Sequence, residues 1–152
     1  MKKLTLLVML VVTATSFAQL KKVETVKSEE IGKVGPFGMP KTIDCTKMGN
    51  KYTFEYKDMQ FPDMNDYKKF SFEDVENTFE DLYKTIMDGF ETMPKEDITL
   101  ELPNYIISLK FTKAIGMTSV AFFSAPKTNT SLIGYSSPLT KKQVEKLFGK
   151  KK

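Results

Sequence analysis

The chain has 152 residues, a formal net charge of +4 and a charged fraction of 28%. It contains no histidine, and all 23 of its basic residues are lysines. Without histidine there is no Ser-His-Asp or Cys-His catalytic site, and the commonest zinc ligand is missing. Without arginine there is no bidentate clamp for phosphate or carboxylate. We therefore assign no catalytic residue and expect no cofactor and no bound metal.

Cys45 is the only cysteine of the chain. A single cysteine excludes an intramolecular disulfide, so the stability of the fold must come from packing. Because a free cysteine behaves as a small apolar residue, we expect Cys45 to be buried on a strand; the alternatives are a reactive thiol and an intermolecular bridge.

The first eighteen residues have the order of a secretory signal peptide. Two lysines precede the apolar run Leu4–Val12, and small residues at positions 16 and 18 precede Gln19. The apolar part is shorter than the roughly 20 residues that a membrane-spanning helix needs. We therefore expect cleavage after Ala18 and export to the periplasm or the cell exterior.

Residues 19–149 are expected to form one domain, because this length supports one sizeable core but not two. The stretch Leu20–Val34 predicts one or two weak strands. Thr42–Lys47 and Lys51–Lys57 flank a short turn and predict a β-hairpin. The second of these segments alternates, so we expect one buried face with three aromatic residues, Tyr52, Phe54 and Tyr56.

Phe70–Met93 is predicted to form one long amphipathic helix. Ser71 is placed to cap its first turn, and Phe70 and Val75 are spaced as a hydrophobic staple. The preceding polar stretch, Asp58–Lys69, is interpreted as a solvated loop. The apolar residues recur at spacings of three and four, which indicates one helical face; they are Phe72, Val75, Phe79, Leu82, Tyr83, Ile86, Met87, Phe90 and Met93.

Further strands are predicted after this helix. Tyr105–Lys113 and Thr118–Ala125 are expected to be paired, central and antiparallel, with Gly116 in the turn between them. Shorter strands are expected at Ile98–Leu102 and Ser131–Ser136. The sequence Leu139–Val144 contains a capping box and a hydrophobic staple, so a short helix is expected from Lys141 to Phe148, ending at Gly149 and followed by a basic tail, residues 150–152.

Strands precede the long helix and follow it, without alternation of strands and helices. This order favours an α+β fold over a parallel α/β fold. We expect one antiparallel β-sheet, with the long amphipathic helix packed on one face and the short helix at the C-terminal end.

Charge is divided along the chain. Residues 55–101 contain 14 acids and 5 lysines, a net charge of −9, whereas residues 102–152 contain 9 lysines and 1 acid, a net charge of +8. One interpretation is that these charges only keep the surface solvated. The other is that they form docking surfaces for partners of opposite charge: an acidic face of Glu73, Glu76, Asp81, Asp88 and Glu91, and a basic face of Lys141, Lys142 and Lys146.

Partners follow from export and from the distribution of lysines. Nucleic acid is not expected, since the protein is exported and its lysines are not interleaved with a platform of aromatic residues. Three terminal lysines are fewer than the roughly four to eight of a lipid-binding cluster, so membrane contact is at most peripheral. No small-molecule substrate is indicated.

The leading hypothesis is a non-enzymatic envelope protein that binds another envelope protein or supports an assembly. A first alternative is a carboxylate-dependent hydrolase of cell-wall glycan, for which Glu55 or Glu101 are candidates if two carboxylates face each other across a cleft. A second is a carrier of small apolar ligands, with an apolar pocket between sheet and helix.

Overall fold

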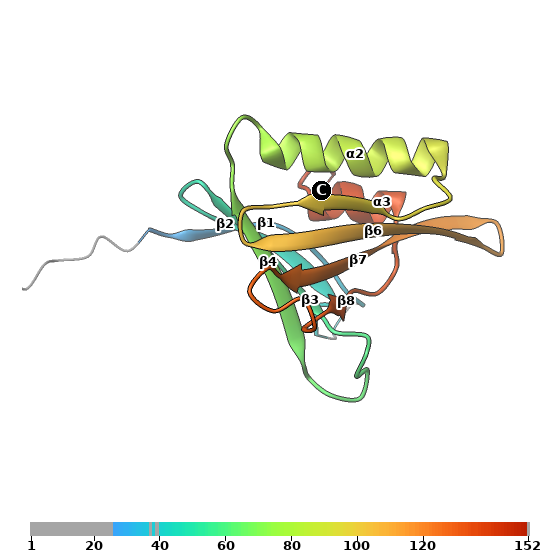
Figure 1. Cartoon of the computed structure of the whole chain (residues 1–152), viewed down its shortest axis with the longest axis horizontal. Helices are drawn as coiled ribbons and strands as arrows, with labels where there is room; N and C mark the ends of the chain where they lie inside the picture. The colour runs from blue at the N-terminus through green and yellow to red at the C-terminus, as the bar shows by residue number, and fades with distance from the viewer. Residues whose placement is uncertain (1–25, 37, 39, 152) are drawn as a thin grey trace, which may run out of the picture.

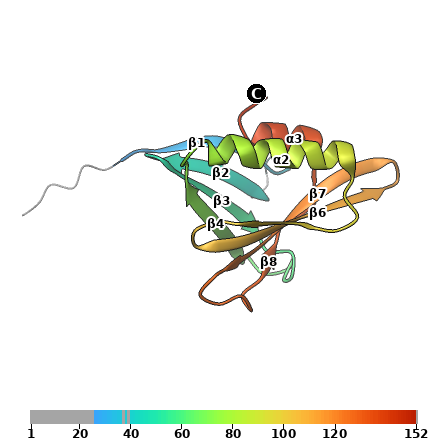
Figure 2. The ribbon, with the colours of Figure 1, turned by 45° about the horizontal axis from the view of Figure 1, so that its top comes forward.

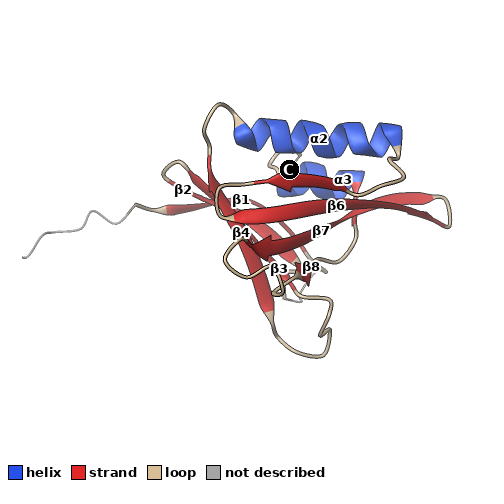
Figure 3. Cartoon of the chain, in the orientation of Figure 1, coloured by secondary structure: helices blue, strands red, loops and turns tan. Residues whose placement is uncertain are grey.

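The structure is a computed structural model that describes residues 26–36, 38 and 40–151. These residues form a single α+β domain with two antiparallel sheets and two helices (Figures 1 and 3). The expected signal peptide, residues 1–18, lies outside the described residues. The elements are β1 (Ser28–Val34), β2 (Ile43–Met48), β3 (Lys51–Lys57), β4 (Tyr67–Glu73), α2 (Thr78–Thr92), β5 (Ile98–Glu101), β6 (Tyr105–Ala114), β7 (Met117–Pro126), β8 (Gly134–Tyr135), β9 (Leu139–Thr140) and α3 (Lys141–Leu147).

The first sheet is a meander of four strands in the order β1-β2-β3-β4. The predicted hairpin between β2 and β3 is confirmed, and Gly49 in its turn has a φ of 62°. The alternation along β3 also has the predicted effect, since Tyr52, Phe54 and Tyr56 are all buried. Sequence periodicity therefore identified the central hairpin of this sheet.

The prediction of a helix from residue 70 is wrong, because Tyr67–Glu73 forms β4. Phe70 lies opposite Phe54 on β3, and their rings are stacked with centroids 5.0 Å apart. Ser71 caps no helix. A short connection of residues 74–77 follows β4, and α2 begins only at Thr78. Asp74 Oδ1 in this connection accepts the N–H of Phe79.

The second sheet contains the strands after α2, in the order β5-β6-β7-β8 with β9 also paired to β7. The prediction of one sheet is therefore wrong, since the described residues form two. The pairing of β6 with β7 is confirmed over ten residue pairs. The strand expected at 131–136 is much shorter, since only Gly134–Tyr135 of this segment pairs with β7. Leu132 and Ile133, which precede it, are exposed.

The two sheets and both helices share one aromatic core. Phe54 lies at its centre, with ring centroids 6.3 Å from Phe122 of β7 and 5.3 Å from Phe148 at the end of α3. Helix α2 buries Phe79, and the ring centroid of Phe79 lies 4.9 Å from that of Phe148, so the two helices are in contact (Figure 2). We conclude that neither sheet has a core of its own.

Helix α3 begins as predicted. Thr140 and Gln143 form a reciprocal capping box, in which the Thr140 side chain accepts the Gln143 N–H and the Gln143 side chain accepts the Thr140 N–H. The helix ends one residue earlier than expected, at Leu147, and Gly149 follows with a φ of 68°. Local capping signals thus determined both ends of this helix to within a residue.

The loop after β3 is anchored by a buried carboxylate. Asp58 is fully buried, and its Oδ1 accepts the N–H groups of Gln60 and Tyr135 at 3.0 and 3.2 Å. The interpretation of Asp58–Lys69 as a solvated loop is therefore wrong at both ends, because Asp58 is buried and residues 67–69 belong to β4. Asp58 connects this loop to β8, a contact that the loop's composition does not indicate.

Cys45 lies on β2 and is fully buried, as expected. Burial raises the pKa of its thiol to about 12, and the charge of Asp44 adds to the shift. Because the thiolate is the reactive form, we expect no labelling of the native protein by a disulfide reagent at pH 8 and full labelling in denaturant. Rapid stoichiometric labelling without denaturant would contradict this placement.

Candidate functional site

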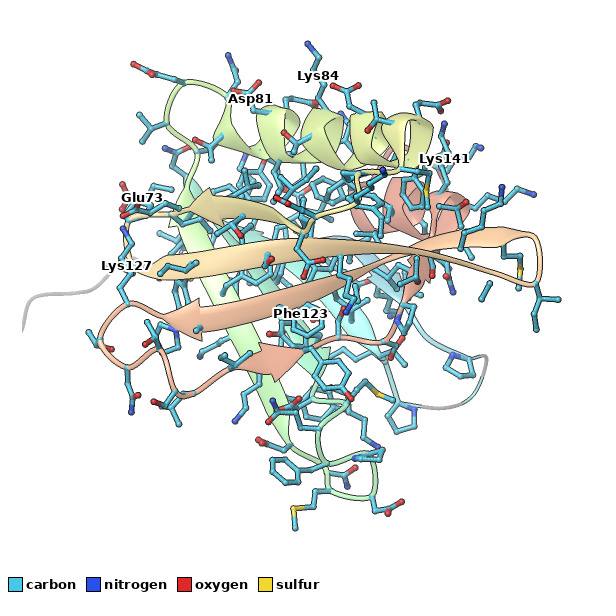
Figure 4. All side chains as sticks on the ribbon, turned by 45° about the vertical axis from the view of Figure 1, so that its right-hand side comes forward. Glu73, Asp81, Lys84, Phe123, Lys127 and Lys141 are labelled. Atoms are coloured by element: carbon cyan, nitrogen blue, oxygen red, sulfur yellow. The ribbon has the colours of Figure 1, made fainter. Side chains whose placement is uncertain are left out.

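The acidic residues predicted as one docking face do not share one helix. Glu73 is the last residue of β4, and Glu76 lies in the connection that precedes α2. Asp81, Asp88 and Glu91 are on α2, and all five side chains are exposed. Figure 4 shows Asp81 and Lys84 on the outer side of α2, away from Glu73. The predicted acidic face is thus divided between the helix and the edge of the first sheet.

The predicted acidic and basic faces meet each other. Lys141 Nζ lies 2.5 Å from Glu91 Oε1, and this bond lowers the pKa of the Glu91 carboxyl and raises that of the Lys141 ammonium. Lys150 forms an ion pair with Glu80 of α2 in the same way. Some acids of α2 and some lysines of the C-terminal segment therefore neutralise each other, because α3 and the residues after it lie beside α2.

The other two lysines of the predicted basic face, Lys142 and Lys146, are not in ion pairs with any residue that the structure describes. Lys142 and Lys146 are exposed, and neither has an ion-pair partner within residues 26–36, 38 and 40–151. Lys142 lines a hollow beside β7, whereas Lys146 lines a different hollow beside β1. Lys141 and Lys142 thus lie beside one another, and Lys146 lies apart from them.

The β6–β7 hairpin projects beyond the end of α2 (Figure 1). Its two-residue turn is Ile115–Gly116, with φ values of 49° and 77°. Ile115 is 100% exposed and Met117 is 65% exposed. We call Ala114–Met117 the hairpin tip. It presents apolar side chains to solvent at the extremity of the molecule.

Ile115 is an unfavourable residue for this turn on two grounds. A two-residue hairpin turn with both φ values positive favours Asn-Gly or Asp-Gly, whereas a positive φ at a β-branched residue is an outlier. Such strain costs about 1–3 kcal/mol and tends to occur at functional sites. Full exposure also means that the side chain gains nothing from burial. Gly116 was predicted in this turn, but the strain at Ile115 was not, although an isoleucine directly before a turn glycine is a local signal for it.

A hollow of about 420 Å³ adjoins the hairpin tip. Met117 belongs to both, so the tip and the hollow form a continuous surface, which we call the arm surface. Phe90 of α2 provides an aromatic part of the wall, and Lys142 provides a positive charge. The hollow is lined by Phe90, Glu91, Met117, Thr118, Thr140, Lys141 and Lys142.

The carboxylates considered for hydrolysis lie apart. Glu55 is on the first sheet, where Lys41 Nζ lies 2.9 Å from it and 2.6 Å from Asp44. Glu101 is on the second sheet, 76% exposed and 2.6 Å from Lys127 Nζ. The structure therefore does not bring Glu55 and Glu101 together.

In the part of the chain that the structure describes, no three acidic, cysteine or histidine side chains are grouped as metal ligands.

The carrier hypothesis expects an apolar pocket between a sheet and the helix. At Gly89 of α2, an added Cβ atom would lie 2.1 Å from Phe111 Cζ on β6, so helix and sheet are in direct contact there. A hollow of about 490 Å³ lies beside β1 and is lined by three lysines and two acids along with Val34, Gly35, Pro36 and Gly38. No helix among residues 26–151 that the structure describes has the length and hydropathy to span a bilayer.

Comparisons with protein-family models, curated proteins and solved structures found no match to this chain.

Proposed function

We propose that the chain is an exported, non-enzymatic protein that binds another protein of the cell envelope through the arm surface. The observation that carries the proposal is Ile115, a fully exposed β-branched residue with a φ of 49°. Its strain and its exposure both oppose stability. A residue that is unfavourable in the free protein is explained if burial in a partner compensates for it.

The shape of the arm surface suggests what the partner provides. The convex tip requires an apolar pocket in the partner, and the adjoining hollow accepts a projecting side chain from it. Lys142 at the rim favours an acidic residue opposite, since charge complementarity speeds association and selects partners. The surface therefore fits a folded protein with an apolar pocket and an acidic rim.

Export is the second part of the proposal. It is supported by the basic start, the apolar run and the small residues of positions 1–18 in the sequence. N-terminal sequencing of the protein isolated from the envelope should begin at Gln19. Recovery of the intact N-terminus from the cytosolic fraction would contradict export.

The partner is located by photo-crosslinking in the cells that produce the protein. A photoreactive amino acid replaces Ile115 in one variant and Thr128, an exposed residue in another loop of the second sheet, in a matched control. We expect a discrete crosslinked protein from position 115 and none from position 128. Absence of a product from position 115, or identical products from both positions, would contradict the proposal.

A second comparison separates the arm surface from the acidic residues of α2. Asp81 and Asp88 are exposed and have no ion-pair partner in the described part of the chain. Replacing both with lysine should leave folding nearly unchanged, since exposed substitutions have small effects. If these reversals abolish the crosslink from position 115, then the acidic residues of α2 are part of the docking surface as well.

A further inference from the structure

We propose that the outer edge of β4 binds an extended segment of a partner protein, which adds to the first sheet as a fifth strand. This mode of recognition joins main chain to main chain, and pockets beside the edge select side chains. The proposal concerns a surface separate from the hairpin tip and does not depend on it. Figures 1 and 2 both place β4 away from the tip of the β6–β7 hairpin.

The backbone of β4 has unpaired groups on its outer side. The N–H of Asp74 donates to Asn50 O at 2.8 Å, so Asp74 directs its backbone groups toward β3. From Glu73 back to Tyr67, the residues of β4 pair with β3 without a register shift. In an antiparallel pair, alternate residues direct both backbone groups to the neighbouring strand, and the residues between them direct theirs away. Among the described residues, no backbone partner is recorded for the N–H and C=O groups of Tyr67, Lys69 and Ser71 or for the N–H of Glu73.

The other edge strands of the two sheets differ from β4. β1 contains a register shift between Glu30 and Gly32, and α3 packs against it. β5 has only four residues, and β8 and β9 have two each. Proteins usually protect edges by such bulges, coverage or shortness. β4 pairs along all seven of its residues with β3 without a bulge, and it is longer than β5, β8 and β9. Its edge is protected by charge instead, from Lys68 and Lys69.

Two hollows lie along this same edge. One has a volume of about 370 Å³ and the other about 230 Å³. Each has β4 as one wall and the second sheet or its turns as the opposite wall, so there is space beside the unpaired groups. The first is lined by Lys51, Ser71, Phe72, Glu73, Val75, Thr78, Pro103 and Asn104, and the second by Tyr67, Lys68, Lys69, Tyr105, Ser124, Pro126 and Leu132.

The lining indicates the side chains of the bound segment. Val75 is 58% exposed in the first hollow, and Leu132 is 55% exposed in the second, so apolar side chains fit both. Lys69 lines the second hollow, is exposed, and has no ion-pair partner within the described residues. The segment therefore alternates apolar and polar residues, because successive side chains of a strand face opposite sides, and it carries an acid opposite Lys69.

The test uses nine-residue peptides of alternating valine and threonine as probes. One threonine is replaced by glutamate in one peptide and by lysine in a second. Binding to the full mature chain is followed by ¹⁵N NMR and amide hydrogen exchange. We expect shifts and slowed exchange at the outward N–H groups of Tyr67, Lys69, Ser71 and Glu73, and tighter binding of the glutamate peptide. Shifts confined to other strands, or none at millimolar peptide, would overturn the proposal.

N-methylation of the peptide tests the backbone contact without altering the protein. Methyl groups on alternate residues that face β4 remove donors, and each lost hydrogen bond should weaken binding by about tenfold or somewhat less. The same number of methyl groups on the other alternate residues should have a smaller effect. Equal effects of the two patterns would show that the peptide does not pair with β4.

Protein variants provide a matched pair at one position. Ser71→Pro removes an outward N–H that β3 does not use, and proline is tolerated on such an edge, whereas Ser71→Ala leaves the N–H in place. We expect Ser71→Ala to bind the glutamate peptide and Ser71→Pro to lose it. Amide exchange is also measured without peptide at several protein concentrations. If exchange of the same amides slows as the protein concentration rises, then two copies of the chain pair through β4, and the proposal of a different partner protein is overturned.

Discussion

Replacing Phe54 with alanine should lower the free energy of unfolding by about 3–5 kcal/mol, the usual loss for a buried phenylalanine. Phe54 is 0% exposed, and its ring lies within 6.3 Å, centroid to centroid, of rings from β4, α2, β7 and the residue after α3. No single element can close the resulting cavity, because its walls belong to both sheets and both helices. The loss should therefore lie at the upper end of this range.

Chemical denaturation followed by fluorescence and circular dichroism measures this effect. The matched control is Phe61→Ala, because Phe61 is 50% exposed in the loop after β3 and should change stability by less than about 0.5 kcal/mol. The wild-type protein should unfold in one transition, since the two sheets share their core. Two separate transitions, with Phe54→Ala affecting only one, would show that the sheets are independent.

Replacing Gly32 with alanine should also be strongly destabilising. An added Cβ atom at this position on β1 would lie 2.1 Å from Lys146 O and 2.7 Å from Leu147 O. Both are backbone atoms of α3, so relief requires movement of the helix rather than rotation of a side chain. Overpacking typically costs about 1–3 kcal/mol and occasionally more, and we expect a loss of at least 2 kcal/mol on the same scale.

Lys33→Ala is the matched control for this substitution. Lys33 is the next residue of β1, and its side chain is 58% exposed in a surface ion pair with Glu30. Such exposed pairs contribute little, about 0–1 kcal/mol. If Gly32→Ala is as well tolerated as Lys33→Ala, then α3 does not pack on β1 as the structure has it.

The helix prediction shows why periodicity alone was ambiguous. Phe70 and Phe72 fit a strand with a period of two, and Phe72, Val75 and Phe79 fit a helical face. The sequence pattern did not decide between them, because the decisive contacts are with Phe54 and Tyr52 on β3. By contrast, the short C-terminal helix was predicted correctly, since the capping box of Thr140 and Gln143 is local.

The candidate surfaces also differ in whether a local sequence signal could predict them. The pairing of Glu91 with Lys141 joins residues fifty positions apart, so no linear count of charges shows that the two predicted faces meet. The unpaired edge of β4 likewise depends on strand order, which the sequence does not reveal. Only the strained turn at Ile115–Gly116 has a local signal, because turn chemistry depends on the two residues themselves.

The central claim is that Ile115 serves binding at the expense of stability, and one substitution tests both sides of it. Asparagine tolerates a positive φ and suits this turn. Ile115→Asn should therefore raise the free energy of unfolding by about 1 kcal/mol. At the same time it should abolish co-purification of the protein that crosslinks at position 115. A variant that is more stable and still retains the partner, or one that is less stable than the wild type, would contradict the claim.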